Sequence, residues 1–120
     1  MQILHVANKD DWQRESPTGV YGKNQIESDG FIHCGTVELV KLIHSKFAGI
    51  EHKKIMLHIN SLKIKGELRW ETSPKRGVAF PHIYGLLNTD AVEKTEDYTD
   101  FVAREFDKTA IVQVAGYLLS

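Results

Sequence analysis

Hydrophobic and polar residues alternate along two stretches of this chain. Residues 54–60 place Ile55, Leu57 and Ile59 on one face, and residues 67–71 show the same period of two. This period is typical of β-strands, whose successive side chains point to opposite faces of a sheet. Shorter apolar stretches indicate two further strands. We therefore predict strands at residues 2–7, 31–34, 54–60 and 67–71.

Another stretch has helical spacing. Apolar residues recur at intervals of three and four between Thr36, which can cap a first turn, and Gly49, a natural stop. This pattern predicts the main helix at about residues 36–48. Asn8 or Asp10 could cap a short helix near the N-terminus.

The remaining segments are less regular. Residues 16–19 and 28–30 have turn composition. Residues 98–106 could be helical, and residues 109–119 could form a strand or a helix. Strands and helices do not alternate strictly along the chain, which favours an α+β fold over a doubly wound parallel sheet. We expect a compact mixed or antiparallel sheet with one main helix and short helices.

Composition and charge narrow the class of protein. The chain has 120 residues, which is one ordinary domain spanning residues 1–120. Its net charge is −1, and this argues against a dedicated nucleic-acid or membrane-surface binder, which would carry a basic excess. The short basic clusters, Lys75-Arg76 among them, are interpreted as solvated surface.

The N-terminal residues and the cysteine count favour a cytoplasmic location. Cys34 is the single cysteine, so the chain can form no internal disulfide. The N-terminus lacks the pattern of a signal peptide, and no apolar stretch is long enough to span a membrane. The oligomeric state is left open.

Histidines are the most conspicuous candidates for chemistry. His33 stands at the end of a predicted strand, where polar side chains often meet a ligand. His82 and Tyr84 lie two residues apart between Pro81 and Gly85, so they share a face if the segment is extended. His5 lies in the first strand, on the same face as Ile3, where a histidine at the edge of the core with a satisfied ring is the simpler interpretation.

Glu71 and Arg69 share one face of a predicted strand. They form either a surface ion pair or part of a site in which the Glu71 carboxylate stabilises a developing positive charge. Cys34 adjoins His33, but neighbouring side chains in a strand diverge, so we expect a small buried residue rather than a nucleophile. A metal site could be built from His5, His33, His82 and Glu71, but no close-spaced pair of metal ligands supports it, so we assign no metal ligands.

Four short motifs occur in one order, and together they resemble a known family. They are L-H-V at residues 4–6, D-G-F-I-H-C at residues 29–34, R-W-E at residues 69–71 and F-P-H-I-Y-G at residues 80–85. The chain is similar over residues 1–92 to the small bacterial family catalogued as domain of unknown function 952. That family has been grouped by fold with ADP-ribosyltransferase-like proteins, which cleave NAD.

The resemblance implies an ADP-ribosyltransferase-like fold and a role for histidines around a ribose. It implies that His5 contacts the ribose, that His33 supplies a second polar group, and that Glu71 or the pair of His82 and Tyr84 faces the reacting sugar. The candidate catalytic residues are therefore His33, Glu71 and His82. The candidate substrate-binding residues are His5, Tyr21, Arg69 and Tyr84.

Three functions remain open from the sequence. The first is an enzyme that handles NAD or another nucleotide, by ADP-ribosyl transfer or glycohydrolysis, with NAD as substrate rather than cofactor. The second is a non-catalytic domain that binds a small metabolite. The third is a metal-dependent hydrolase. The usual nucleotide-binding fingerprints, G-x-G-x-x-G after a strand and G-x-x-x-x-G-K, are absent, so a bound nucleotide requires another geometry.

Overall fold

Antiparallel strands and short helices make up this chain, which we describe from a computed structural model for residues 1–107. The order of elements confirms the predicted α+β class. The strands are β1 (Gln2–Asn8), β2 (Val20–Tyr21), β3 (Ile32–His33), β4 (Lys54–Asn60), β5 (Glu67–Thr72), β6 (Ala79–Tyr84), β7 (Leu87–Asn88) and β8 (Val92–Asp97). The α-helices are α1 (Lys9–Glu15), α2 (Lys23–Asp29), α3 (Val37–Ile43) and α4 (Tyr98–Val102).

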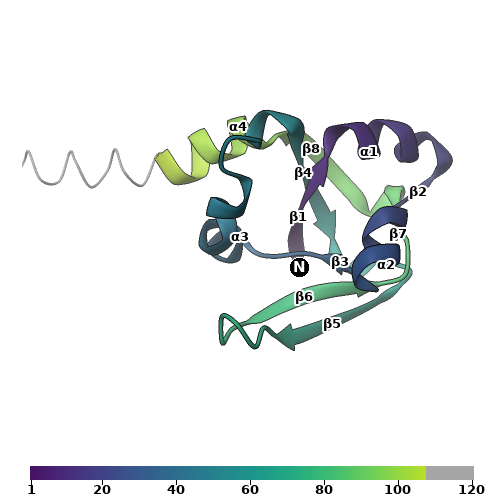
Figure 1. Cartoon of the computed structure of the whole chain (residues 1–120). Coiled ribbons are helices and arrows are strands. Elements are labelled where there is room, and N and C mark those ends of the chain that lie inside the picture. The colour runs from purple at the N-terminus through teal and green to yellow at the C-terminus, as the bar shows by residue number, and fades with distance from the viewer. Residues whose placement is uncertain (108–120) are drawn as a thin grey trace, which may run out of the picture.

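Two three-stranded sheets form the framework. Strand β4 pairs with β1 and β8, and β6 pairs with β3 and β5, all antiparallel. Figure 1 shows the β5–β6 hairpin along the lower edge of the molecule and β1, β4 and β8 above it. The two sheets are joined where the backbones of Leu4 and Gly35 exchange two hydrogen bonds, each 2.8 Å long. Strand β2 pairs with β7 in a separate short ladder.

The sheet around β4 is buried on both faces. Leu57 and Ile59 belong to one apolar cluster, which includes Tyr21 from β2, while Met56 belongs to another, with Phe101 from α4. The alternation in residues 54–60 is therefore a central strand, since even its more polar face carries the buried His58. His58 bonds the Glu96 carboxylate, which also accepts hydrogen bonds from Arg104.

The predicted helices are present, with shorter α-helical parts. Thr36 caps α3 through a hydrogen bond from the Leu39 amide, and the second half of the predicted helix is a 3₁₀ turn, His44–Phe47. Asn8 caps α1. Residues 98–106 are helical, as α4 followed by the π-helical turn Ala103–Asp107. The expected element at residues 109–119 lies outside the described residues.

One helix was not predicted. Residues 28–30 had the composition of a turn, but Ser28 and Asp29 are the last residues of α2, and Gly30 ends it in the left-handed conformation. The helix starts after Gly22, whose φ of 112° is also left-handed. Since a glycine has no capping side chain and Ile26 is the sole large apolar residue of α2, the sequence carried no amphipathic signal.

Candidate functional site

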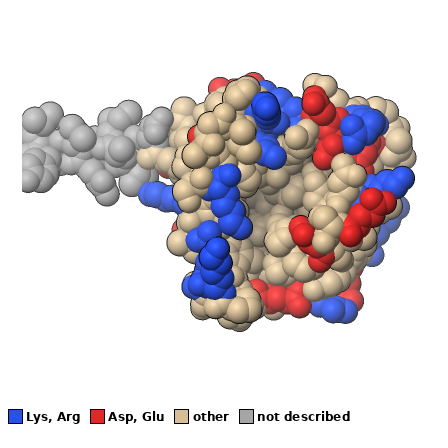
Figure 2. All heavy atoms as spheres, in the orientation of Figure 1, with Lys and Arg blue, Asp and Glu red and all other residues tan. Residues whose placement is uncertain are grey.

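A cavity of about 550 Å³ opens between the two three-stranded sheets. Its lining comes from β1, β3 and β6, from helices α2 and α3, and from the loop between β5 and β6. Figure 2 shows a hollow at the centre of the surface, with Lys and Arg gathered on its left side and acidic and basic side chains intermixed on its right. This volume lies within the range of about 300–1,000 Å³ that is typical of sites for small molecules.

His82 lies in the cavity wall and is fixed on two sides. Its Nδ1 lies 2.9 Å from Glu71 Oε1, so Nδ1 donates and the carboxylate accepts. Its ring is stacked on Phe31, with centroids 3.9 Å apart and planes inclined by 20°. Within residues 1–107, Nε2 has no hydrogen-bond partner. The arrangement therefore sets the tautomer and leaves one ring nitrogen for a ligand.

Glu71 lies behind His82 rather than in the cavity lining. Oε1 also accepts a hydrogen bond from the Tyr84 hydroxyl. The bonds from Tyr84 and His82 lower the pKa of the Glu71 carboxyl, and the bond to Glu71 raises the pKa of Tyr84. Glu71 is thus an ionised group that orients its neighbours.

Arg69 and Tyr84 form the outer part of this cluster and also lie outside the cavity lining. The Arg69 guanidinium lies over the Tyr84 ring, 4.4 Å from its centroid. Arg69 pairs with Glu67 through two hydrogen bonds of 2.9 Å. The expected ion pair of Arg69 with Glu71 is therefore replaced by one with Glu67, and Glu71 instead accepts its two bonds from β6.

His33 lines the cavity next to His82, which is its partner in the β3–β6 ladder. Their ring centroids are 5.3 Å apart. His33 Nε2 lies 3.1 Å from Asp29 Oδ2, at the C-terminal end of α2. Partial burial lowers the pKa of His33, while Asp29 opposes that shift and the nearby His82 adds to it. Asp29 is the only carboxylate among the described residues that line the cavity.

His5 is buried, and protein groups occupy both of its ring nitrogens. Nδ1 donates to the His33 carbonyl at 2.5 Å, so the neutral ring must accept at Nε2, from the Tyr21 hydroxyl at 2.9 Å. Burial lowers the pKa of His5 to about 4. His5 thus positions the backbone of His33, and only its carbon edge is left to face a ligand.

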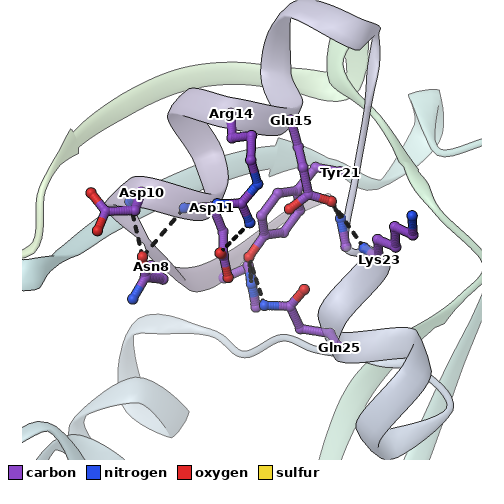
Figure 3. Close-up of polar contacts among 10 residues, drawn as sticks. Asn8, Asp10, Asp11, Arg14, Glu15, Tyr21, Lys23 and Gln25 are labelled. Carbon is purple, nitrogen blue, oxygen red and sulfur yellow. Dashed lines mark hydrogen bonds and ion pairs between the residues drawn. The ribbon is translucent and has the colours of Figure 1, made fainter.

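Tyr21 is fully buried and lies outside the cavity lining. Its oxygen accepts a hydrogen bond from Gln25 Nε2 at 3.0 Å, which Figure 3 shows as the contact between β2 and α2. Burial is the main reason that the pKa of Tyr21 is raised. Tyr21 therefore links Gln25 to His5 beneath the cavity wall.

Cys34 is buried next to His33, as expected for a strand in which neighbouring side chains diverge. Burial raises the pKa of its thiol, so the thiolate needed for nucleophilic attack is disfavoured. Residues 1–107 contain no group of three or more His, Cys, Asp or Glu side chains that could hold a metal ion. None of their helices could span a membrane, being too short or too polar.

Sequence reasoning missed several lining residues. Arg76, interpreted as solvated surface, lies in the cavity wall, and Lys46 lines it from the turn after α3. Gln25 and Asp29 line it from α2, where their spacing of four residues places them on one face. Nothing in the sequence pattern groups these four residues, because they come from two helical segments and a loop that meet only in the fold.

Three solved structures of one bacterial protein are similar in fold to this chain. A crystal structure of protein CC0527 from Caulobacter crescentus shares 24% identity with this chain, covers 81% of it and 85% of its own chain, and gives a TM-score of 0.70. A crystal structure of its double mutant gives the same values. The solution NMR structure shares 25% identity, covers 80% and 83%, and gives a TM-score of 0.67.

The family comparison agrees with the motifs in the sequence. No functionally curated protein matches the chain. The model of a family described as "Protein of unknown function (DUF952)" matches residues 6–95, which include His33 and His82 of the cavity lining and begin one residue after His5. Because this match covers well over half of the chain, the chain belongs to the DUF952 family.

Proposed function

We propose that the chain is an enzyme that acts on a nucleotide-like small molecule in the cavity, with His82 as an acid–base group oriented by Glu71. The observation that carries the proposal is the hydrogen bond between Glu71 Oε1 and His82 Nδ1 at the cavity wall. A carboxylate behind an imidazole fixes its tautomer and stabilises its protonated form, as general acid–base catalysis requires.

The aromatic wall supports a ligand with a flat ring. Phe31, Phe47 and Phe80 line the cavity together with His33 and His82. Such rings offer stacking surfaces, while the polar groups among them are few and spaced apart, as in small-molecule sites generally. A nucleotide has both a flat base and a polar sugar, so it is suited to this lining.

NAD is the first substrate to test, because the family resemblance implies an ADP-ribosyltransferase-like fold. Hydrolysis breaks the bond between the nicotinamide nitrogen and the ribose, and the bonding pair leaves with nicotinamide. Water then attacks the cationic ribose and gives its proton to His82, so the products are nicotinamide, ADP-ribose and a proton. In this proposal Asp29, the carboxylate in the cavity lining, stabilises the cation, and His33 contacts the sugar.

The test is an NMR time course of NAD with the purified protein. We expect free nicotinamide to accumulate, and His82→Ala to slow its formation by about 10²–10⁴-fold. Glu71→Gln should lower kcat by tenfold or more with KM nearly unchanged, because Glu71 acts through His82. His52→Ala is the matched control, since His52 is exposed and lies outside this cavity, and it should retain full activity.

A non-catalytic metabolite-binding domain is the second candidate. The observation that favours it is that four of the seven expected site residues lie outside the lining, namely Tyr21, Arg69, Glu71 and Tyr84. In that case NAD signals broaden with wild-type protein and no nicotinamide appears. Retention of wild-type turnover by a folded His82→Ala variant would exclude the acid–base role.

A further inference from the structure

Two cationic side chains line the cavity without an acidic partner. Lys46 and Arg76 form no ion pair within residues 1–107. Among the described residues, the Arg76 guanidinium bonds only the carbonyl oxygen of Leu42, at 3.4 Å. Arg69, on the same β5–β6 hairpin as Arg76, lies outside the lining and is paired with Glu67. The lining thus carries uncompensated positive charge at one side.

Gln25, which lines the cavity from α2, on the other side of the molecule from α3 in Figure 1, carries an unmet hydrogen-bond acceptor. Gln25 Oε1 is buried and has no partner within residues 1–107. Its orientation follows from the network beneath the wall. His5 Nδ1 must donate to a carbonyl, so Tyr21 must give its one proton to His5 Nε2 and accept from the Gln25 amide nitrogen. The amide oxygen of Gln25 is therefore left over.

A buried acceptor without a partner is destabilising, because it has lost its hydrogen bonds to water and gained none in the fold. A ligand with a hydroxyl or amino group near Gln25 would supply the missing donor. The Asp29 carboxylate, four residues further along α2, is a second acceptor on the same side. This side of the cavity is therefore suited to the donor-rich part of a ligand, whereas the side with Lys46 and Arg76 is suited to an anion.

We propose that Lys46 and Arg76 form a phosphate subsite, and that the ligand is a nucleotide whose sugar or base donates a hydrogen bond to Gln25 Oε1. The proposal rests on the proposed function for the location of the ligand, and it adds the ligand's phosphate and its direction in the cavity. Arginine binds phosphate through paired N–H groups, and lysine adds a mobile point charge. Lys46 comes from the turn after α3 and Arg76 from the β5–β6 loop, so the phosphate would bridge these two segments on one side of the cavity.

The experiment compares adenosine with adenosine diphosphate as probes, which share base and sugar, by calorimetric titration. We expect the diphosphate to bind at least tenfold more tightly, with an affinity that falls as salt concentration rises. Lys46→Ala and Arg76→Ala should each weaken the diphosphate about tenfold and leave adenosine unaffected. Lys75→Ala is the matched control, because Lys75 adjoins Arg76 in sequence but lies outside the lining, and it should bind as the wild type does.

The Gln25 end is tested with Gln25→Leu, which has no acceptor. It should weaken adenosine and the diphosphate by the same factor, since the lost bond is to the part they share. Equal affinity of the wild type for the two probes, or equal losses in the Lys46, Arg76 and Lys75 variants, overturns the phosphate subsite.

Failure of this proposal is distinguishable from failure of the proposed function. Tight binding of the diphosphate without any cleavage of NAD supports the subsite and removes the NAD reaction. Cleavage of NAD that Lys46→Ala and Arg76→Ala leave unchanged supports the enzyme and removes the subsite. The thermal unfolding midpoint of each variant checks that it is folded. Because Lys46 is exposed, Lys46→Ala should leave this midpoint unchanged.

Discussion

At the scale of single residues, His5 shows how a polar group becomes part of the core. Its two hydrogen bonds, to the His33 carbonyl and from the Tyr21 hydroxyl, require the neutral ring. Protonation would turn Nε2 from an acceptor into a donor. Its proton would then face the proton of the Tyr21 hydroxyl, and this hydrogen bond would be lost. The ring is also withdrawn from water, so desolvation penalises the charged form.

We therefore predict that acid destabilises the fold through His5. Burial lowers the pKa of His5 from 6.5 to about 4. Between these pH values His5 is therefore mostly protonated in the unfolded chain and mostly neutral in the folded one. The loss of stability is negligible well above pH 6.5 and grows as the pH falls, reaching about 3 kcal/mol near pH 4. Urea unfolding from pH 7 to pH 4 measures it.

The variant His5→Gln separates this effect from other acid-sensitive groups. It should be less stable than the wild type at pH 7 but should lose less stability between pH 6.5 and pH 4. The NMR signals of the His5 ring should stay unchanged from pH 8 to pH 5 in the wild type. Parallel stability curves for the two proteins, or a His5 midpoint near pH 6.5, would contradict the assignment.

The sequence identified the cavity histidines for sound local reasons. A strand end before a helix start brings His33 to the edge of its sheet, and a period of two puts His82 and Tyr84 on one face. It could not separate their roles, because the position of Tyr84 behind Glu71 depends on the register of β5 against β6. The sequence could not predict the other polar lining residues, because they come together only through tertiary packing. These residues are Gln25, Asp29, Lys46 and Arg76.

At the scale of elements, helix α2 depends on the glycine that precedes it. Gly22 has a φ of 112°, and a β-carbon there would lie 2.4 Å from Ile32 Cδ1. Ile32 is fully buried in the core, so its side chain has little room to move aside. The position of α2, and with it the placement of Gln25 and Asp29 in the cavity wall, therefore requires glycine at this residue.

We predict that Gly22→Ala destabilises the protein by roughly 2–4 kcal/mol. Left-handed backbone contributes about 1–2 kcal/mol and the overlap with Ile32 adds the rest. Gly19→Ala is the matched control, because Gly19 has a φ of 88° but no atom within 4 Å of the added carbon, so it should lose only the first part. Urea unfolding compares the two. An equal loss in both variants would show that the contact with Ile32 is relieved without cost.

At the scale of the whole molecule, the cavity lies between two sheets of unequal burial. The sheet of β1, β4 and β8 has an apolar cluster on each face. The β3–β6–β5 sheet has β5 at its edge, where Trp70 is 44% exposed. Within residues 1–107, the two hydrogen bonds of Leu4 with Gly35 are the backbone link between these sheets.

This inequality predicts a gradient of hydrogen exchange across the molecule. The amides of Leu57 and Ile59, in the central strand β4, should exchange through global unfolding, while the bonded amides of β5 should exchange at least 100-fold faster through local opening. Exchange rates are measured by NMR at two pH values. Rates that rise with pH show that closing is faster than chemical exchange, so that each rate reports the free energy of opening. Equal protection in both sheets would mean that they open as one unit. A gradient would place His82 and Glu71 on the less stable sheet and His5 on the more stable one. A ligand contacting both sheets should then slow exchange in β5 and β6 as much as in β4 if local opening of the β3–β6–β5 sheet abolishes binding, and less if it does not.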